Sequence, residues 1–128
     1  MRLLLLVAML LAVPAAAAEP EWHAAREYDV LLRPYDYEPA TIRLEAGEPV
    51  RLTFINQGQA TFSFSAEDFF RAARIRSGDA EAVAGGRIRV EPGAHRTIAL
   101  VPAAGQYRAH SANLLHRLWG MRAEIIVE

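Results

Sequence analysis

The sequence contains no cysteine, and this absence removes several kinds of structure at once. No disulfide bond can form, so the fold must be held together by an ordinary apolar core. No paired-cysteine zinc site, lipid-modified cysteine or thiolate metal ligand is available either. Of the 128 residues, 52% are hydrophobic, which provides enough apolar material for a core of the usual kind.

Lysine is also absent, and neither sign of charge dominates the chain. All 14 basic residues are arginines, against 15 acidic residues, and the formal net charge is −1 at pH 7. We ascribe the arginine bias to genome composition and draw no function from it. A charge balance of this kind gives no electrostatic reason to expect nucleic acid or an anionic membrane as a partner.

No apolar run is long enough to cross a membrane. The longest run, residues 3–13, is about 11 residues long, whereas a spanning helix needs about 20. It follows a basic start and leads through Pro14 into an Ala-x-Ala site that ends at Ala18. This is the pattern of a secretory signal peptide, residues 1–18, and it predicts a periplasmic or secreted protein with no membrane span after cleavage.

Enzyme motifs are missing as well. The sequence holds no phosphate-binding loop and no zinc-binding cysteine pairs. Ser111 lies near His110 and His116, but neither a Gly-x-Ser-x-Gly elbow nor an acidic third member surrounds it. We therefore expect that the protein is not an enzyme and has no catalytic residues.

After residue 18 the chain is dominated by short segments rich in β-formers or in alternating apolar residues. Predicted strands cover residues 27–32, 41–45, 50–56, 61–65, 86–90, 96–101, 107–111 and 123–127. Glycine and proline turns separate them, and residues 66–75 change period and fit one short helix. About eight strands at this spacing predict an all-β fold, a two-sheet Greek-key β-sandwich with one short helix.

The domain boundaries follow from the same pattern. Residues 19–26 are polar and are expected to form a mobile lead-in. Residues 27–128 show no internal repeat, no heptad pattern and no linker, so we expect one domain over this range.

Several sequence signals occur in an order that is known from one family of β-sandwiches. They are Tyr37-Glu-Pro39, Ile42-x-Leu44-x-Ala46-Gly47-Glu48, Asn56-x-Gly58, Pro92-Gly93, Gly105-x-Tyr107, His116-x4-Met121 and Ile125-x-Val127. This order resembles the cupredoxins, both the exported plastocyanin and azurin type and the cupredoxin-like modules associated with bacterial iron and copper handling. The resemblance covers nearly all of residues 27–128. It implies a function linked to copper or iron binding and electron transfer.

The resemblance also implies where a copper ion would sit. In the family, copper is held by a first histidine, a cysteine, a second histidine and a methionine, the last three on the final loop. The second histidine and the methionine correspond to His116 and Met121, the candidate metal ligands. The cysteine position falls on Ser111 with one loop spacing and on Asn113 with another. Either way the thiolate is lost.

The first histidine is lost too. Its position, after the Asn-x-Gly turn, falls on Phe62, or on Thr61 if the turn is one residue tighter. A type 1 blue copper site needs two imidazoles and a thiolate, so it cannot form here. The resemblance is then compatible only with weak copper binding, by His116 and Met121 with or without a third ligand.

Two functions therefore stay open. In the first, the protein is an exported metal-handling or redox-associated protein that binds copper weakly through His116 and Met121. In the second, it is a metal-free cupredoxin-fold binding module. Its loop carries the apolar residues Leu114, Leu115, Leu118 and Trp119, which either pack over the absent metal or form an exposed patch that docks on a periplasmic protein partner. The family docks partners through the surface around this loop, so losing the metal need not remove the interface.

Overall fold

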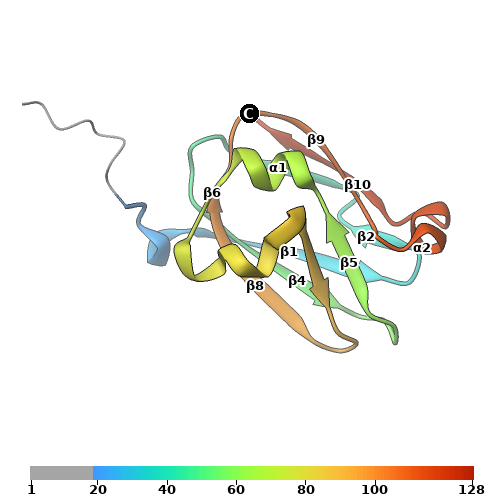
Figure 1. The fold of residues 1–128 in the computed structure, drawn as a ribbon. Helices are drawn as coiled ribbons and strands as arrows, with labels where there is room; N and C mark the ends of the chain where they lie inside the picture. The colour runs from blue at the N-terminus through green and yellow to red at the C-terminus, as the bar shows by residue number, and fades with distance from the viewer. Residues whose placement is uncertain (1–18) are drawn as a thin grey trace, which may run out of the picture.

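The computed structural model describes residues 19–128, which fold into two packed β-sheets (Figure 1). The sheets have five strands each, in the orders β2-β1-β4-β8-β6 and β3-β10-β9-β5-β7. The strands are β1 (Arg26–Arg33), β2 (Asp36–Glu38), β3 (Thr41–Leu44), β4 (Val50–Asn56), β5 (Phe62–Ser65), β6 (Arg74–Ile75), β7 (Arg87–Val90), β8 (His95–Val101), β9 (Gly105–His110) and β10 (Arg122–Val127). The predicted signal peptide, residues 1–18, lies outside the described residues.

The predicted two-sheet β-sandwich with a short helix is confirmed. The predicted helix is α1 (Glu67–Ala72), which buries Phe69 and Phe70 and carries its acidic residues in the first turn. Two further helical segments, η2 (Trp22–Ala24) and η3 (Ser77–Gly86), are of the 3-10 type. A second short helix, α2 (Leu114–Leu118), lies in the loop that we expected to be irregular.

Two other segments differ from the sequence prediction. The proline-rich turn after β1 contains the three-residue strand β2, which is too short to show an alternating pattern. The lead-in before β1 makes contacts that its polar composition did not suggest. Trp22 Nε1 donates to the Glu19 carboxylate at 2.8 Å, and the same carboxylate lies 3.1 Å from Arg74 on β6.

The alternating strands place their apolar residues between the sheets. On β4 the buried residues Val50, Leu52 and Phe54 alternate with half-exposed ones, as the sequence pattern predicts. The strand pairs with β1 in parallel and with β8 in antiparallel register. On the other sheet, β10 runs parallel to β3 and antiparallel to β9. The final strand of the chain therefore lies in the interior of its sheet.

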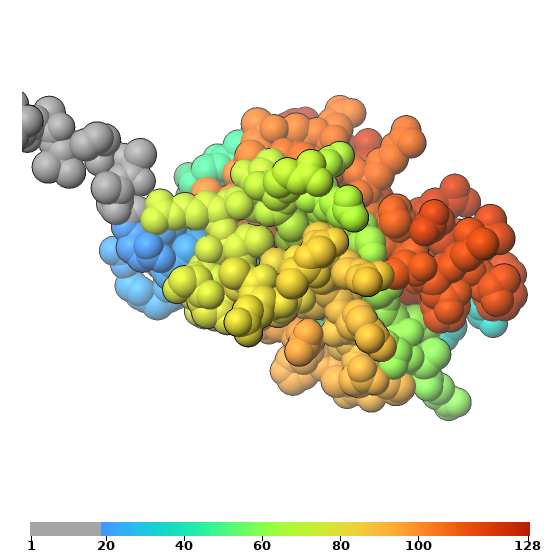
Figure 2. Space-filling model, in the orientation of Figure 1, coloured from blue at the N-terminus to red at the C-terminus, as the bar shows by residue number. Residues whose placement is uncertain are grey.

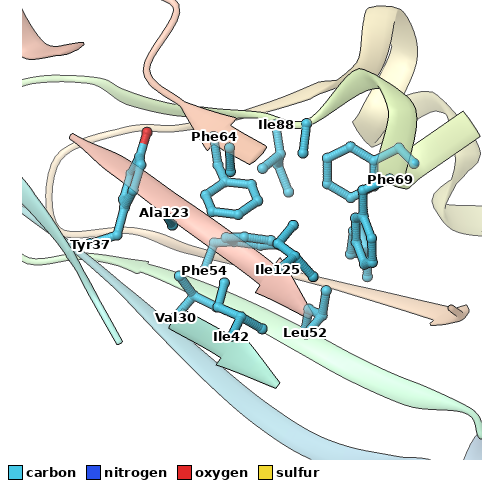
Figure 3. Packing of buried hydrophobic residues seen from close by; sticks show 14 of the residues in the cluster. Val30, Tyr37, Ile42, Leu52, Phe54, Phe64, Phe69, Ile88, Ala123 and Ile125 are labelled. Atoms are coloured by element: carbon cyan, nitrogen blue, oxygen red, sulfur yellow. The ribbon is translucent and has the colours of Figure 1, made fainter. Parts of the chain in front are cut away.

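The core between the sheets is built around aromatic rings (Figure 3). Phe64 on β5 is the centre, with its ring 4.9 Å from Phe54, 5.2 Å from Tyr37 and 6.4 Å from Phe70. The aliphatic residues Val30, Ile42, Leu52, Ile88 and Ile125 fill the space around these rings. Because the rings come from both sheets and from α1, they join all three parts of the fold.

Asn56, at the end of β4, ties three segments together with its side chain. Its Nδ2 donates to the carbonyl oxygens of Ala60 at 2.8 Å and Val90 at 2.9 Å, and its Oδ1 accepts from the Gly58 amide at 2.8 Å. Asn56 is 2% exposed, and its bond to Val90 is fully buried. The predicted Asn-x-Gly turn therefore fixes the path of the chain into β5 and Phe62.

Replacing Asn56 with alanine is expected to lower the free energy of unfolding by about 2–3 kcal/mol, because the buried Val90 carbonyl and the part-buried bond to Ala60 lose their donor. Urea denaturation followed by circular dichroism measures the change. Gln57→Ala is the control, since that side chain is exposed and its loss should change stability by less than about 0.5 kcal/mol. Equal stability of the two variants would contradict the role given to Asn56.

Candidate functional site at the α2 end

Strands β9 and β10 are joined by residues 111–121, which contain helix α2 and lie at one end of the sandwich (Figure 1). Asn113 caps the helix, because its side-chain oxygen accepts from the amides of Leu115 at 2.9 Å and His116 at 3.3 Å. We did not predict this helix from the sequence, since five residues are too few to show a helical period. The one sequence signal for this helix is Asn113, a residue type that often caps helices, followed by Leu114 and Leu115.

The loop closes on itself and against a neighbouring hairpin. The Met121 amide donates to the His116 carbonyl at 3.0 Å, and the Ser111 amide donates to the Met121 carbonyl at 3.1 Å. Gly120 has a φ of +114°, and a Cβ atom there would lie 2.7 Å from the backbone oxygen of Tyr35. A residue other than glycine would push the loop away from the β1–β2 turn.

Two buried serines attach the start of the loop to β5. Ser111 is fully buried, and its hydroxyl lies 3.5 Å from that of Ser63 and accepts from the Asn113 amide at 3.2 Å. The Ser63 hydroxyl accepts from the Ala112 amide at 2.7 Å. The loop therefore leaves β9 in a direction that is fixed by hydrogen bonds.

Tyr37 supports the same region from the other sheet. Its hydroxyl donates to the carbonyl oxygen of Ser63. Burial raises the pKa of Tyr37 above its ordinary value, although the Ser111 hydroxyl and the Arg117 charge act in the opposite direction. The phenol is therefore protonated at neutral pH and serves as a hydrogen-bond donor, not as an acid or a base.

Phe62 and His116 meet beneath the loop. The Phe62 ring, 3% exposed, makes an edge-to-face contact with the His116 ring, with centroids 5.3 Å apart. Gly58 leaves room for this ring, because a Cβ atom at Gly58 would lie 2.4 Å from it. Within the described residues, His116 Nδ1 is buried and has no hydrogen-bond partner. Met121 is fully buried and belongs to the core.

The arrangement does not fit a type 1 copper ion. Of the two candidate cysteine positions, Ser111 is buried at the base of the loop, whereas Asn113 is exposed and occupied in capping α2. Of the two candidate positions for the first histidine, Phe62 contacts His116, whereas the Thr61 hydroxyl donates to the Glu91 carboxylate at 2.8 Å.

If Phe62 is the first-histidine position, a hydrocarbon ring lies beside His116 in place of an imidazole. If Ser111 is the cysteine position, a buried hydroxyl replaces the thiolate. The predicted ligands His116 and Met121 supply one imidazole and one thioether, and a type 1 site needs two further donors. In the part of the chain from 19 to 128, no three His, Cys, Asp or Glu side chains are grouped so that they could hold a metal ion.

Five large apolar side chains form an exposed surface at this end of the molecule, which we call the apolar end surface. Each is between 55% and 65% exposed, and together they are all the exposed large hydrophobic residues of the described chain: Tyr35, Leu114, Leu115, Leu118 and Trp119. Figure 2 shows the red segment that carries α2 protruding from the rest of the molecule. The four residues predicted for a partner-binding loop are thus exposed together.

Tyr35 is the member of this surface that we did not predict. It lies in the β1–β2 turn with a φ of +72°, and its ring makes an edge-to-face contact with Trp119 at 5.2 Å. A pocket of about 280 Å³ opens between the two segments, lined by Pro34, Tyr35, Gln59, Ala60, Phe62, His116 and Trp119. A tyrosine in a proline-containing turn carries no sequence signal that would link it to a loop so far along the chain.

Comparison with known protein families shows one match. The family model described as a cupredoxin-like domain matches residues 2–127. A comparison with curated proteins found no match.

Solved structures with the same fold include auracyanins and parts of multi-copper oxidases. Auracyanin B is 18% identical, with 81% of this chain and 89% of that chain covered and a TM-score of 0.60. The dithionite-reduced auracyanin of the photosynthetic bacterium Roseiflexus castenholzii is 20% identical, with 82% and 98% covered and a TM-score of 0.58. A multi-copper oxidase from Pseudomonas Thermotolerans is 15% identical, with 81% and 29% covered and a TM-score of 0.62. At these identities the likeness shows the fold alone.

Restoring the two missing ligands should create a copper site if Ser111 and Phe62 occupy the ligand positions. The double variant Phe62→His/Ser111→Cys is expected to bind Cu(II) and to show the visible thiolate-to-copper charge-transfer band of a blue copper centre. Absorption spectroscopy during copper titration measures the band.

The matched control is Phe62→His/Asn113→Cys, which places the thiol at the exposed helix cap, and it should show no such band. A band from the control and none from the Ser111 variant would mean that Asn113 is the ligand position.

Proposed function

The chain belongs to the family of cupredoxin-like domains, and from this premise we propose that it is an exported, metal-free member that docks on a protein partner through its apolar end surface. One observation carries the proposal. The end of the sandwich that would hold copper has a phenylalanine ring packed on its histidine, and the same end exposes five large apolar side chains. Phe62 contacts the imidazole that would bind the metal, whereas the five apolar side chains at the same end are exposed.

The apolar end surface has the properties of a protein-binding site. Tryptophan, tyrosine and leucine side chains left in water forgo the free energy that burial would give, about 25 cal/mol per Å² of apolar area. A cluster of them on a protein surface marks an interaction site more often than chance exposure does. Tryptophan and tyrosine are also the aromatic residues on which binding free energy is usually concentrated.

The surface is held in place before any partner binds. Asn113 caps α2, Gly120 places the loop against the backbone of Tyr35, and the Trp119 ring packs on the Tyr35 ring. Fewer side chains must therefore be ordered on binding, which lowers the entropic cost of association. This rigidity supports docking on a preformed partner surface.

The place of action that we propose is the periplasm or the cell exterior. The basic start, short apolar run and Ala-x-Ala site of residues 1–18 support export. Within residues 19–128, no helix is both long enough and apolar enough to cross a bilayer. The absence of cysteine is compatible with an oxidising compartment, since no thiol is at risk there.

The proposal contains no catalytic step. The Ser111 hydroxyl is engaged with Ser63 and with the Asn113 amide, so neither nearby histidine is bonded to it. His110 Nδ1 lies 3.1 Å from the backbone oxygen of Ser111 instead. A serine nucleophile needs a base within hydrogen-bond reach, and this arrangement supports a binding function over catalysis.

Weak copper handling is the second candidate function, and one observation favours it. His116 Nδ1 is a buried nitrogen without a partner in the described structure, and such an atom is able to accept a soft cation. Met121 supplies a thioether on the same loop. Two protein ligands of this kind suit Cu(I) better than Cu(II).

A photo-crosslinking residue at position 118 tests the docking proposal. We expect p-benzoylphenylalanine there to give one discrete adduct with an envelope protein of the native host. The yield should fall several-fold when Leu115→Ser and Trp119→Ser are added, because both remove apolar contact area. Immunoblotting of adducts measures the yield. The same photo-crosslinker at Thr97, on the exposed face of β8, is the control and should give no adduct.

An adduct of dimer size that the purified protein alone reproduces would contradict docking on a different protein. An adduct from Leu118 that is unaffected by the two serine substitutions would contradict the apolar end surface as its origin.

Copper titration separates the second candidate from the first. We expect calorimetry with Cu(I) and with Cu(II) to show no stoichiometric binding, because Phe62 occupies the side of His116 where another ligand would lie. His116→Ala should then leave the titration unchanged. One equivalent of Cu(I) bound by the unaltered protein and by His95→Ala, but not by His116→Ala, would establish the copper function instead.

A further inference from the structure

A second surface, on the outer face of the sheet β3-β10-β9-β5-β7, is lined by arginines. An open hollow of about 760 Å³ there is bordered by Arg87 on β7, Arg108 and His110 on β9, and Arg117 on α2. Arg122 on β10 adjoins it, in a smaller depression that Arg108, His110 and Arg117 also line. We call these five side chains the basic face.

The strand register places three of these residues in one row across the sheet. Arg87 pairs with Ser65, Ser65 pairs with His110, and His110 pairs with Arg122. Directly paired residues of antiparallel strands project to the same side of a sheet. Since neighbouring strands lie about 4.8 Å apart, the row from Arg87 to Arg122 spans roughly 14 Å.

The arginines of the basic face have no acidic partners. Of the nine other described arginines, six form ion pairs with carboxylates and Arg43, Arg89 and Arg96 do not; the six are Arg26, Arg33, Arg51, Arg71, Arg74 and Arg76. Across residues 19–128, none of Arg87, Arg108, Arg117 and Arg122 makes such a pair. Arg117 donates only to the backbone oxygen of Ser111, at 3.4 Å.

Nearby carboxylates do not neutralise the basic face. Glu67 and Asp68 border the hollow from α1, and Asp68 is paired with Arg71 at 3.3 Å. Glu124 stands opposite Arg108 in the register of β9 and β10. Counting Arg71, five arginines therefore face three carboxylates, in a chain whose formal net charge is −1. Like charges on one face of a sheet repel one another, and an anionic partner would reduce that repulsion.

We infer that the basic face binds an acidic polypeptide segment of the docking partner, through carboxylates that pair with Arg87, Arg108, Arg117 and Arg122. This inference rests on the proposed function and adds the chemistry of the partner to it. Guanidinium groups bind carboxylates through two parallel hydrogen bonds, which gives such pairs both strength and a defined geometry.

The size of the row favours a polypeptide over a single small oxyanion. The backbones of Arg87 and Arg122 lie roughly 14 Å apart, and about five residues of an extended chain span that length and can pair with guanidinium groups along it. Alternate residues of such a chain point to the same side, so acidic residues at every second position would face the sheet.

Arg117 joins this surface to the apolar end surface. It lies on α2 among the exposed leucines, and it also lines both depressions of the basic face. A partner that covers α2 therefore comes within reach of the arginines. The apolar contacts would supply most of the affinity, and the charges would orient the partner and speed its association.

A fluorescein-labelled hexaglutamate peptide tests the inference on the purified protein by fluorescence anisotropy. We expect saturable binding that weakens as NaCl is raised from about 0.02 M to about 0.3 M, because exposed ion pairs are screened by salt. The double variant Arg108→Gln/Arg122→Gln should weaken binding roughly fivefold or more. The control Arg26→Gln/Arg96→Gln removes the same charge from β1 and β8 and should change binding less than about twofold.

Several outcomes would overturn the inference. These are no binding of hexaglutamate at low salt, equal losses in the two double variants, or competition by inorganic phosphate at the same concentration as by unlabelled peptide. Preferential binding to vesicles of anionic phospholipid over the peptide would assign the basic face to a membrane surface instead.

The experiments distinguish a failure of the docking proposal from a failure of the basic-face inference. Leu115→Ser/Trp119→Ser should leave hexaglutamate binding unchanged, because neither side chain lines the hollow. Loss of the photo-crosslinked adduct with retained hexaglutamate binding would locate the failure in the apolar end surface. Retained adduct with no peptide binding would locate it in the basic face.

Discussion

The fold depends on a continuous series of aromatic contacts between its two sheets. Tyr37 touches Phe64, Phe64 touches Phe54 and Phe70, and through Phe69 the series reaches Tyr107, with successive ring centroids between 4.9 and 6.4 Å apart. All of these contacts except the tilted Phe54–Phe64 pair have the edge-to-face geometry that aromatic quadrupoles favour. At one end of the series the Tyr37 hydroxyl holds Ser63, so the packing of the core is transmitted directly to the base of the α2 loop.

Much of this fold is encoded by local patterns, and those parts were predictable from sequence. Alternation in segments such as Val50–Asn56 predicts strands whose inward residues do lie in the core. The Asn56-x-Gly58 signal predicts a turn, and Asn56 does form it. Helix α2 and strand β2 were not predicted, because each is too short for its apolar residues to show a repeating pattern.

The functional surfaces were only partly predictable. Leu114 to Trp119 are conspicuous in sequence because they lie next to one another, and the apolar loop was predicted for that reason. Tyr35 joins them across the sandwich, and the basic face collects residues from β7, β9, α2 and β10. These residues are brought together by the strand order and register, which cannot be inferred from net charge or composition. A nearly neutral chain can thus carry a strongly one-sided distribution of charge.

Gly120 sets a limit on how this end of the molecule can vary in length. The loop is attached at Ser111 through its hydrogen bonds to Ser63 on β5 and to Met121. It is attached again at Gly120, where its backbone lies against that of Tyr35 with no side chain between them. A residue inserted between these two attachments would have to bulge outward through α2, and a deletion would pull the β1–β2 turn inward. Changes in the number of residues in the loop must therefore be matched in the turn, so the two segments can only be lengthened or shortened together.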